Sequence, residues 1–112
     1  MNCVADDATR NSRAQSLQGK TGWHCCHFTS YCVYGDKSVI VGARNWLNFG
    51  SNTSNPSEAV VIVNQDGSHV GVVVDQGSKV WHSPGANSGK PIKSYSFSDF
   101  TKYVMPNYFL KK

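Results

Sequence analysis

The sequence predicts an α+β domain in which helices come first and an antiparallel sheet follows. Residues 6–35 show helical spacing of apolar side chains and helix-ending glycines. Beyond residue 58, β-branched runs alternate with short turns that contain Gly, which is typical of antiparallel hairpins. A chain of 112 residues builds one hydrophobic core. We therefore expect a single catalytic domain over residues 1–112.

Two short helices are expected in the N-terminal third of the chain. The first covers residues 6–17, begins with acidic side chains and stops before Gly19. The second covers residues 25–34 and ends at Gly35, a residue type that readily adopts the left-handed conformation found at helix ends. The side chains that share one face of this second helix are Cys25, Phe28, Thr29 and Cys32.

The remaining elements follow from the change of periodicity. Apolar residues 39–47 favour a third helix, and the polar residues 50–57 favour a loop. Three strands of an antiparallel meander and a fourth strand are expected at residues 59–63, 69–74, 79–82 and 92–97. Ser98 is expected to cap a last helix that runs to about Val104.

The register of the second hairpin brings two histidines together. A turn at residues 76–77 places His82 opposite Gly71, with His69 diagonal to His82 on the same face, ~7 to 8 Å away. A four-residue loop preserves this register, whereas a three-residue loop would separate the histidines onto opposite faces. Gly71 in a valine-rich strand indicates a close approach, for which the start of the Cys25 helix is the candidate.

These residues form a candidate catalytic group. Free amides and the positive dipole end at a helix start stabilise a thiolate and a developing oxyanion. Together with an imidazole, such a setting lowers a cysteine pKa from ~8.5 to roughly 3.5 to 7.5. Cys25 would attack a carbonyl carbon, His69 would act as base and then acid, and His82 would orient His69. The Cys25 amide is one oxyanion donor, and the sequence identifies no second donor.

Three segments also match the pattern of a known hydrolase family. They are Cys25-x-x-Phe28, Ser68-His69-Val70-Gly71-Val72-Val73-Val74 and Val80-Trp81-His82-Ser83-Pro84-Gly85. Between about Gly22 and Lys93 this layout resembles NlpC/P60 and CHAP-type peptidoglycan amidases. Basic charge, small size and the cysteine-bearing helix also resemble type VI secretion amidase effectors and their domesticated relatives secreted by ticks and mites. The resemblance implies a papain-like fold and hydrolysis of amide bonds in the peptide stem or crosslinks of peptidoglycan, without a cofactor.

The sequence departs from that family around the nucleophile. Family members usually have an acidic or amide residue before it and small residues after it, whereas this chain reads His24-Cys25-Cys26-His27. Cys26 therefore stays open as an alternative nucleophile. We favour Cys25, because it lies on the helical face expected to meet the sheet; Cys26 then points away and is free to bridge Cys3.

Spacing limits the disulfides. In a helix over residues 25–34, Cys26 and Cys32 are about 9 Å apart at ~1.5 Å per residue, and Cys25 and Cys32 are further apart. Bridged Cα atoms are rarely more than about 7 Å apart, so Cys3 is the one plausible partner for any of the others. At most one ordinary disulfide is expected, with Cys3–Cys26 favoured.

Composition limits which binding partners and which cellular location we expect for this protein. Eleven Lys and Arg against seven Asp and Glu make the protein basic, which favours anionic cell walls. The basic residues are scattered rather than clustered with aromatics, and no apolar run could span a bilayer, so neither a nucleic-acid nor a membrane partner is expected. Four cysteines and the sequon Asn52-Thr53-Ser54 favour secretion, with delivery into a target periplasm as the alternative.

Two competing interpretations were weighed. A zinc site at residues 24–27 would need four consecutive helical side chains to converge on one ion, which they do not, so no metal is expected. A non-catalytic, disulfide-stabilised basic antimicrobial or wall-binding module is the alternative from another class. It requires an oxidised Cys25, whereas the amidase requires a free thiol. We expect a monomer with peptidoglycan as substrate.

Overall fold

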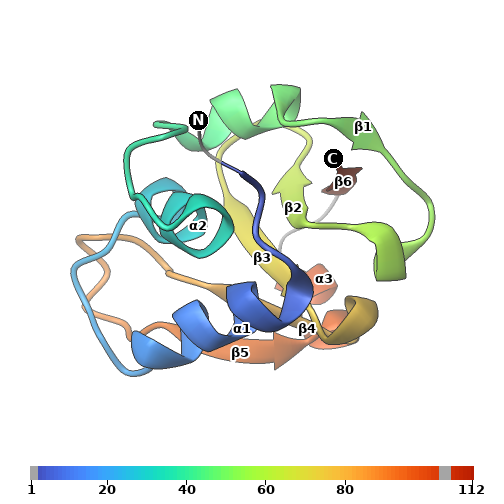
Figure 1. Ribbon diagram of the computed structural model, residues 1–112. Coiled ribbons are helices and arrows are strands. Elements are labelled where there is room, and N and C mark those ends of the chain that lie inside the picture. The colour runs from blue at the N-terminus through green and yellow to red at the C-terminus, as the bar shows by residue number, and fades with distance from the viewer. Residues whose placement is uncertain (1–2, 104–106) are drawn as a thin grey trace.

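The computed structural model describes residues 3–103 and 107–112. Two N-terminal helices pack on a six-stranded antiparallel sheet, which confirms the α+β prediction. Figure 1 shows α1 and α2 in front of the strands and the short α3 behind them. No described helix has the length and apolar character needed to cross a membrane.

The two N-terminal helices begin and end where the sequence predicts. α1 (Asp7–Ser16) is capped by the Asp6 carboxylate, which accepts a hydrogen bond of 2.8 Å from the Thr9 amide. α2 (Cys25–Tyr34) ends at Gly35, which has a φ of 77°. An L side chain is strained in that conformation, so glycine is the favoured residue at this helix end.

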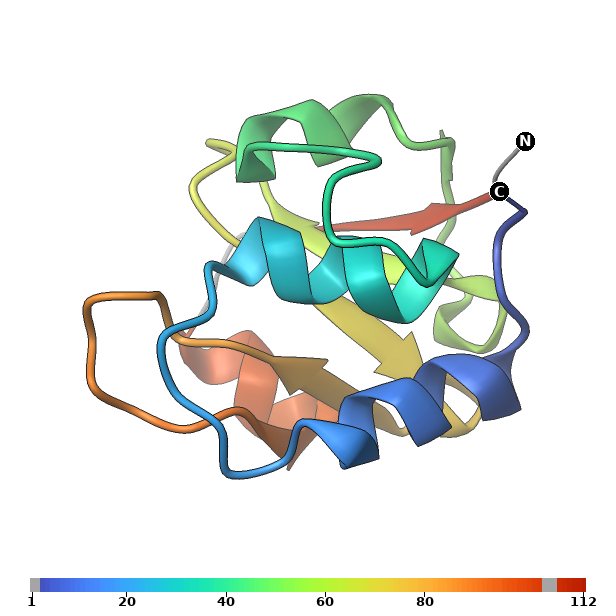
Figure 2. The ribbon, with the colours of Figure 1, turned by 60° about the vertical axis from the view of Figure 1, so that its left-hand side comes forward.

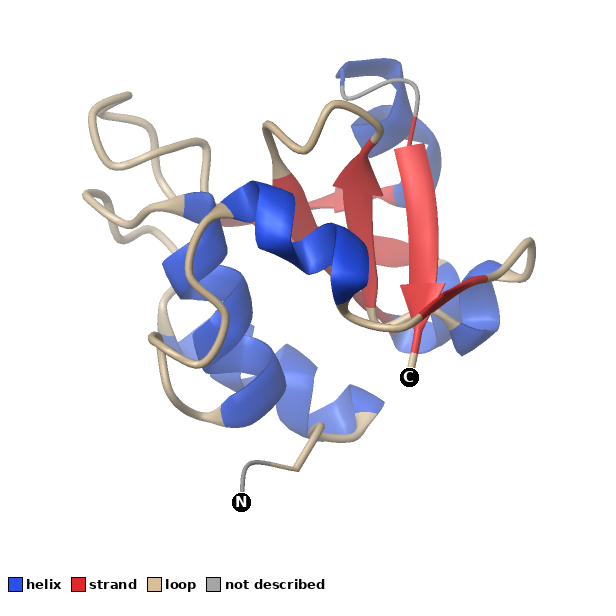
Figure 3. Ribbon diagram, turned by 90° about the horizontal axis from the view of Figure 1, so that it is seen from above, coloured by secondary structure: helices blue, strands red, loops and turns tan. Residues whose placement is uncertain are grey.

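The predicted third helix is only partly correct. Residues 43–48 form a 3-10 helix, η1 (Ala43–Asn48), and the residues before it are not helical. The hydroxyl oxygen of Ser30 in α2 accepts hydrogen bonds from the amides of Val39 and Ile40, at 3.0 and 3.4 Å. These bonds hold the segment against α2. η1 then bridges the helices and the strands, as seen from above in Figure 3.

The sheet contains two strands that the sequence analysis missed. Its order is β1-β6-β2-β3-β4-β5. The strands are β1 (Ser51–Asn52), β2 (Val61–Asn64), β3 (Val70–Val74), β4 (Lys79–His82), β5 (Lys93–Ser96) and β6 (Asn107–Lys111). β6 lies between β1 and β2, so the expected loop at residues 50–57 is wrong in its first part. Pairing between segments this far apart leaves no local turn signal in the sequence.

The last helix, α3 (Phe97–Tyr103), starts two residues earlier than a cap at Ser98 would place it. The hydroxyl oxygen of Ser96, rather than of Ser98, accepts a hydrogen bond of 3.2 Å from the Asp99 amide at the start of this helix. The prediction that Ser98 is the cap is therefore wrong. The expected end at Val104 lies outside the described residues.

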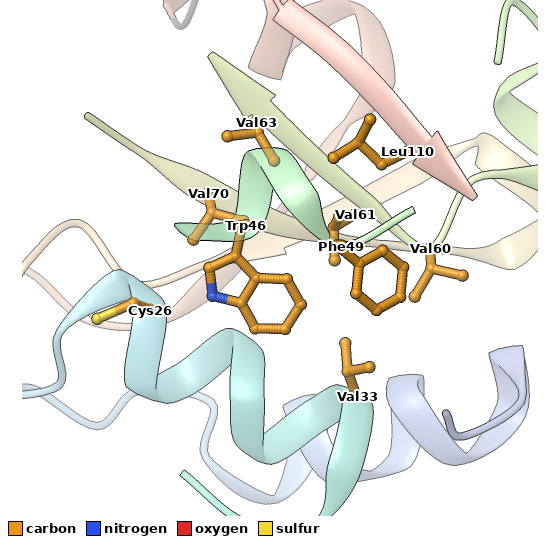
Figure 4. Close-up of a cluster of buried hydrophobic side chains, with 9 residues drawn as sticks. All are labelled: Cys26, Val33, Trp46, Phe49, Val60, Val61, Val63, Val70 and Leu110. Carbon is orange, nitrogen blue, oxygen red and sulfur yellow. The ribbon is translucent and has the colours of Figure 1, made fainter. Parts of the chain in front are cut away.

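β3 is buried on both faces and forms the centre of the core. Val72 and Val74 pack against α1 and α2, whereas Val73 packs on the opposite face with Phe100 of α3. A third group of buried side chains lies between α2, η1 and the strands β2, β3 and β6, as Figure 4 shows. Its members are Cys26, Val33, Trp46, Phe49, Val60, Val61, Val63, Val70 and Leu110. Burial on both faces explains why this strand is rich in valine and contains no polar side chain.

A buried arginine completes the hydrogen bonding of β3. The Val60 amide in the neighbouring segment donates to Leu110, so it is turned away from the Val73 carbonyl. The Arg10 guanidinium donates to that carbonyl through Nε at 3.2 Å and Nη2 at 3.0 Å, and to the Ala5 carbonyl through Nη1 at 2.8 Å. The sequence analysis assigned no role to Arg10.

Candidate active site

The two histidines meet as the hairpin register predicts. β3 and β4 pair Val72 with Trp81 and Val74 with Lys79, which is the expected register. The Nε2 atom of His69 lies 2.9 Å from Nδ1 of His82, a hydrogen bond between the rings. The imidazoles project from the same face, with centroids 5.0 Å apart.

The connection between β3 and β4 is the four-residue loop rather than the two-residue turn. η3 (Asp75–Gly77) contains two non-glycine residues with positive φ, Asp75 at 52° and Gln76 at 55°. The amides of both donate to the Asp7 carboxylate of α1, at 2.8 and 2.9 Å. This carboxylate holds the loop in a conformation that L residues rarely adopt.

The histidine pair lies against aromatic rings. The Phe100 ring lies 6.3 Å from the His69 ring and 5.0 Å from the His82 ring, and the Tyr95 ring lies 5.0 Å from His82. A Cβ added at Gly71 would meet a Val80 side chain and the Phe100 ring. The close approach at Gly71 therefore comes from β4 and from Phe100 of α3, and the expectation that the Cys25 helix packs there is wrong.

Both imidazoles are electrically neutral at neutral pH. Burial lowers the pKa of His69 below its usual 6.5. The pKa of His82 falls to about 3, first because of burial and then because of positive charge on His69 and Lys93. A neutral imidazole has one N–H donor and one lone-pair acceptor. One ring therefore donates and the other accepts in the bond between them.

An asparagine fixes the start of the histidine strand. The Asn64 side-chain oxygen accepts from the His69 amide at 3.0 Å, and the Asn64 amide donates to the His69 carbonyl at 3.2 Å. Asn64 Nδ2 also donates to the Ser68 hydroxyl at 2.6 Å. The sequence analysis missed Asn64, although its position just before the first hairpin turn favours such local bonding.

Cys25 is the first residue of α2, as predicted. The preceding N-cap residue, His24, makes no side-chain cap, so the first amides of this helix have no capping side chain. The Cys25 side chain is half-buried and packs against the cluster of Figure 4.

The pKa of Cys25 moves in the opposite direction from the sequence prediction. Burial raises the pKa of this thiol, and the neighbouring Cys26 raises it further. Backbone hydrogen bonding from Val70, Cys26 and Cys25 opposes that rise but does not cancel it. The predicted lowering is wrong because desolvation disfavours the thiolate more than the amides stabilise it. Cys25 is thus a thiol at neutral pH.

Two contacts attach the start of α2 to the ends of the histidine strands. The backbone of Val70, the residue after His69, lies close enough to the Cys25 thiol to affect its pKa. The hydroxyl of Ser83, the residue after His82, donates to the Trp23 carbonyl at 2.5 Å. In each contact, the strand residue involved directly follows a histidine in the sequence. The two contacts bring the helix start to the end of the strands where His69 and His82 lie.

The thiol and the imidazoles are nevertheless not hydrogen-bonded to each other. Within the described residues, the Cys25 sulfur makes no hydrogen bond with His69 or His82. The Val70 side chain points towards α2, so the neighbouring His69 side chain leaves the strand on the opposite face, where it contacts Phe100. The thiol therefore packs on the α2 side of β3, and the rings lie on the Phe100 side.

The remaining cysteines correct the disulfide prediction. All four cysteines are free thiols; Cys3 is exposed and Cys26 is buried. Cys26 is 9 % exposed and packs in the core with Trp46 and Val33 (Figure 4). The expected outward orientation of Cys26 and its bridge to Cys3 are wrong, because η1 covers the side of α2 that the helical pattern left to solvent. Cys32 is also buried, and burial raises its pKa to about 12.

The other histidines stay outside this arrangement. His24 is exposed and its ring lies 5.2 Å from that of His27. In the part of the chain that the structure describes, no three His, Cys, Asp or Glu side chains are grouped so that they could hold a metal ion.

Comparisons with known proteins add no family assignment. No family model, curated protein or solved structure matches this chain. The functional argument therefore depends on the residues and geometry of the site.

Proposed function

We propose that this protein is a cysteine amidase of the papain-like NlpC/P60 type that hydrolyses amide bonds in the peptide stem or crosslinks of bacterial peptidoglycan. The observation that carries the proposal is the 2.9 Å bond between His69 and His82 at the strand ends to which the Cys25 helix start is attached. A nucleophile, a base and a residue that orients the base are the parts such a reaction needs.

The ring contact suggests how the base is prepared. On this proposal, His69 is the donor in the 2.9 Å contact and gives its Nε2 proton to Nδ1 of His82, and this tautomer leaves the Nδ1 lone pair of His69 free. As substrate binds, that lone pair takes the proton of the Cys25 thiol. Hydrogen bonds of catalytic groups often tighten only when substrate is present. The absence of a direct bond in the free protein is compatible with this step.

The reaction then proceeds in two halves. The Cys25 sulfur bonds to the amide carbon, and the amides at the start of α2 stabilise the oxyanion of the tetrahedral intermediate. The carbon–nitrogen bond breaks, and the leaving amine takes the proton held by His69. Water, deprotonated by His69, attacks the thioester carbon, the carbon–sulfur bond breaks, and the Cys25 sulfur takes the proton back from His69. The products are the restored thiol and a carboxylic acid, which loses its proton to solvent.

The pKa directions favour base catalysis over a preformed ion pair. Burial raises the pKa of Cys25 and lowers the pKa of His69, so the neutral pair is the resting state. The proton moves during the attack on the carbonyl rather than before it. This differs from enzymes in which a thiolate and an imidazolium are already present.

Motif resemblance and charge support the choice of substrate. The His-Val-Gly strand and the His-Ser-Pro-Gly strand end resemble peptidoglycan amidases, and the net charge of +4 favours anionic walls. On this proposal the protein is secreted and monomeric, or is an effector delivered to a target periplasm. The non-catalytic alternative needs Cys25 in a disulfide, and the structure contains free thiols.

The test compares two neighbouring cysteines. Purified peptidoglycan is digested with the wild type, Cys25→Ser and Cys26→Ala, and the soluble fragments are identified by mass spectrometry. We expect fragments with a newly freed amine and carboxylate from the wild type and from Cys26→Ala, and none from Cys25→Ser. Circular dichroism checks that both variants fold. Wild-type yields from folded Cys25→Ser would contradict the proposal.

A further inference from the structure

A lysine lies beside the histidine pair on the same face of the sheet. Lys93 is the cross-strand partner of His82 in the β4–β5 pairing. Its ammonium nitrogen lies 5.0 Å from the centroid of the Tyr95 ring, and that ring lies 5.0 Å from His82. Directly opposite residues project on the same face, as do residues two apart in one strand. Lys93, Tyr95 and His82 therefore form a continuous group.

The charge of Lys93 has no carboxylate partner. Among the residues that the structure describes, ion pairs join Lys79 to Asp75 and Lys111 to Glu58, and no carboxylate lies within ion-pair distance of Lys93. The Tyr95 face restrains the ammonium through a cation–π contact without neutralising it. An exposed cation is thus held next to the candidate site and remains available to an anion.

Backbone hydrogen bonds place a second lysine beside the segment that carries Lys93. The Gly19 amide donates to the Ile92 carbonyl and the Ile92 amide donates to the Lys20 carbonyl, both at 2.9 Å. Lys20 therefore runs alongside the segment that carries Lys90 and Lys93. Figure 2 shows this loop on the same side as the segment that leads into α2. Neither Lys20 nor Lys90 is in an ion pair with a described carboxylate.

We propose that Lys93 binds a carboxylate of the substrate, so that the site selects acidic peptides over their uncharged counterparts. This inference rests on the amidase function proposed above. The ring centres of His69, His82 and Tyr95 and the Lys93 ammonium are 5.0 Å apart at each step. An extended residue spans ~3.3 to 3.6 Å, so the carboxylate lies within about four residues of the scissile amide.

Paired substrates distinguish this role from a general effect on the histidines. Two synthetic stem peptides are compared that differ in one group, a free carboxylate or the corresponding carboxamide. We expect Lys93→Met to raise KM for the carboxylate peptide about threefold to tenfold, and more than for the carboxamide. Lys93→Arg should restore most of the preference. Lys37→Met, an equal charge change on an exposed loop, is the matched control.

A binding measurement separates failure of this inference from failure of the proposed function. Calorimetry with Cys25→Ser and with Cys25→Ser/Lys93→Met uses the same two peptides and needs no turnover. Tighter binding of the carboxylate peptide by Cys25→Ser, lost in the double variant, supports the inference even if no cleavage is found. Three results would overturn the inference. They are an equal loss of affinity for both peptides in the double variant, a fall in kcat without a rise in KM in Lys93→Met, and equal affinity of Cys25→Ser for both peptides.

Discussion

His82 illustrates how burial sets the protonation state of a candidate catalytic side chain. The His82 ring contacts the rings of His69, Phe100 and Tyr95, and these neighbours exclude the water that would stabilise a charged imidazole. The pKa of about 3 follows mainly from that loss of water. A neutral ring with a free lone pair can hold the His69 proton in place.

Replacing His82 tests its orienting role. In His82→Phe the ring bulk remains but the acceptor for the His69 Nε2 proton is lost, so we expect kcat to fall by about 10² to 10⁴ with a smaller change in KM. His82→Asn offers an amide oxygen as acceptor and should retain more activity. The two variants are compared by steady-state hydrolysis of a stem peptide. Equal kcat values for both would show that the acceptor is not what matters.

The same burial makes stability depend on pH. In the unfolded chain His82 binds a proton near its usual pKa of 6.5, whereas in the native state it does so only near 3. The contribution to stability is therefore complete above about pH 6.5 and is lost progressively as pH falls towards 3. We expect the melting temperature to fall between pH 7.5 and pH 4.5, and to fall less in His82→Phe. Parallel curves for the two proteins would contradict this.

At the scale of elements, the site depends on how α2 is attached to the sheet. Ser83 is buried and its hydroxyl donates to the Trp23 carbonyl, two residues before the nucleophile. The backbone of Val70 lies at the thiol on the other strand. The helix start is thus fixed by the residue after each histidine, so the two strands position the candidate nucleophile as well as the candidate base.

Removing the Ser83 hydroxyl tests that attachment. Ser83→Ala leaves the Trp23 carbonyl unpaired, so we expect a loss of about 1 kcal/mol in the free energy of unfolding and a lower kcat. Urea denaturation and steady-state kinetics measure the two effects. Ser88→Ala removes a hydroxyl that donates to the Gly85 carbonyl and accepts from the Lys90 amide in an exposed loop, and should change neither. A matching loss of kcat in Ser88→Ala would refute the role of Ser83.

Local patterns predicted the elements that local forces determine. Gly35 marked the end of α2, and hairpin arithmetic paired His69 with His82, because both depend on neighbouring residues. β6 was missed because its partners lie far away in the chain. The sequence predicts Cys26 on the solvent side of α2, because helical periodicity cannot show that η1 covers a second side of this helix.

At the scale of the whole molecule, side chains packed on both faces of the sheet hold its central strand, β3, in place. β3 is covered by α1 and α2 on one face and by Phe100 on the other, and β6 extends the sheet beyond β2. Arg10 joins α1, β3 and the N-terminal segment through three hydrogen bonds. The strand that carries the candidate base is therefore fixed at both of its faces and along its backbone.

Arg10 is expected to matter for stability rather than for the reaction. Arg10→Met keeps most of the side-chain bulk but leaves the Val73 and Ala5 carbonyls without the guanidinium, so we expect a loss of about 1 to 3 kcal/mol in the free energy of unfolding. Urea denaturation measures it, with Arg44→Met, an exposed position, as control. Equal stability of the two variants would show that the buried bonds contribute nothing net.

The most direct test of the central claim is to find the covalent intermediate. A stem peptide with an activated amide is mixed with the wild type, the reaction is quenched in acid within the first turnover, and the digested protein is mapped by mass spectrometry. The account predicts an acyl group attached through a thioester to Cys25. Turnover with the acyl group on another residue, or with no acyl-protein at any time, would contradict it.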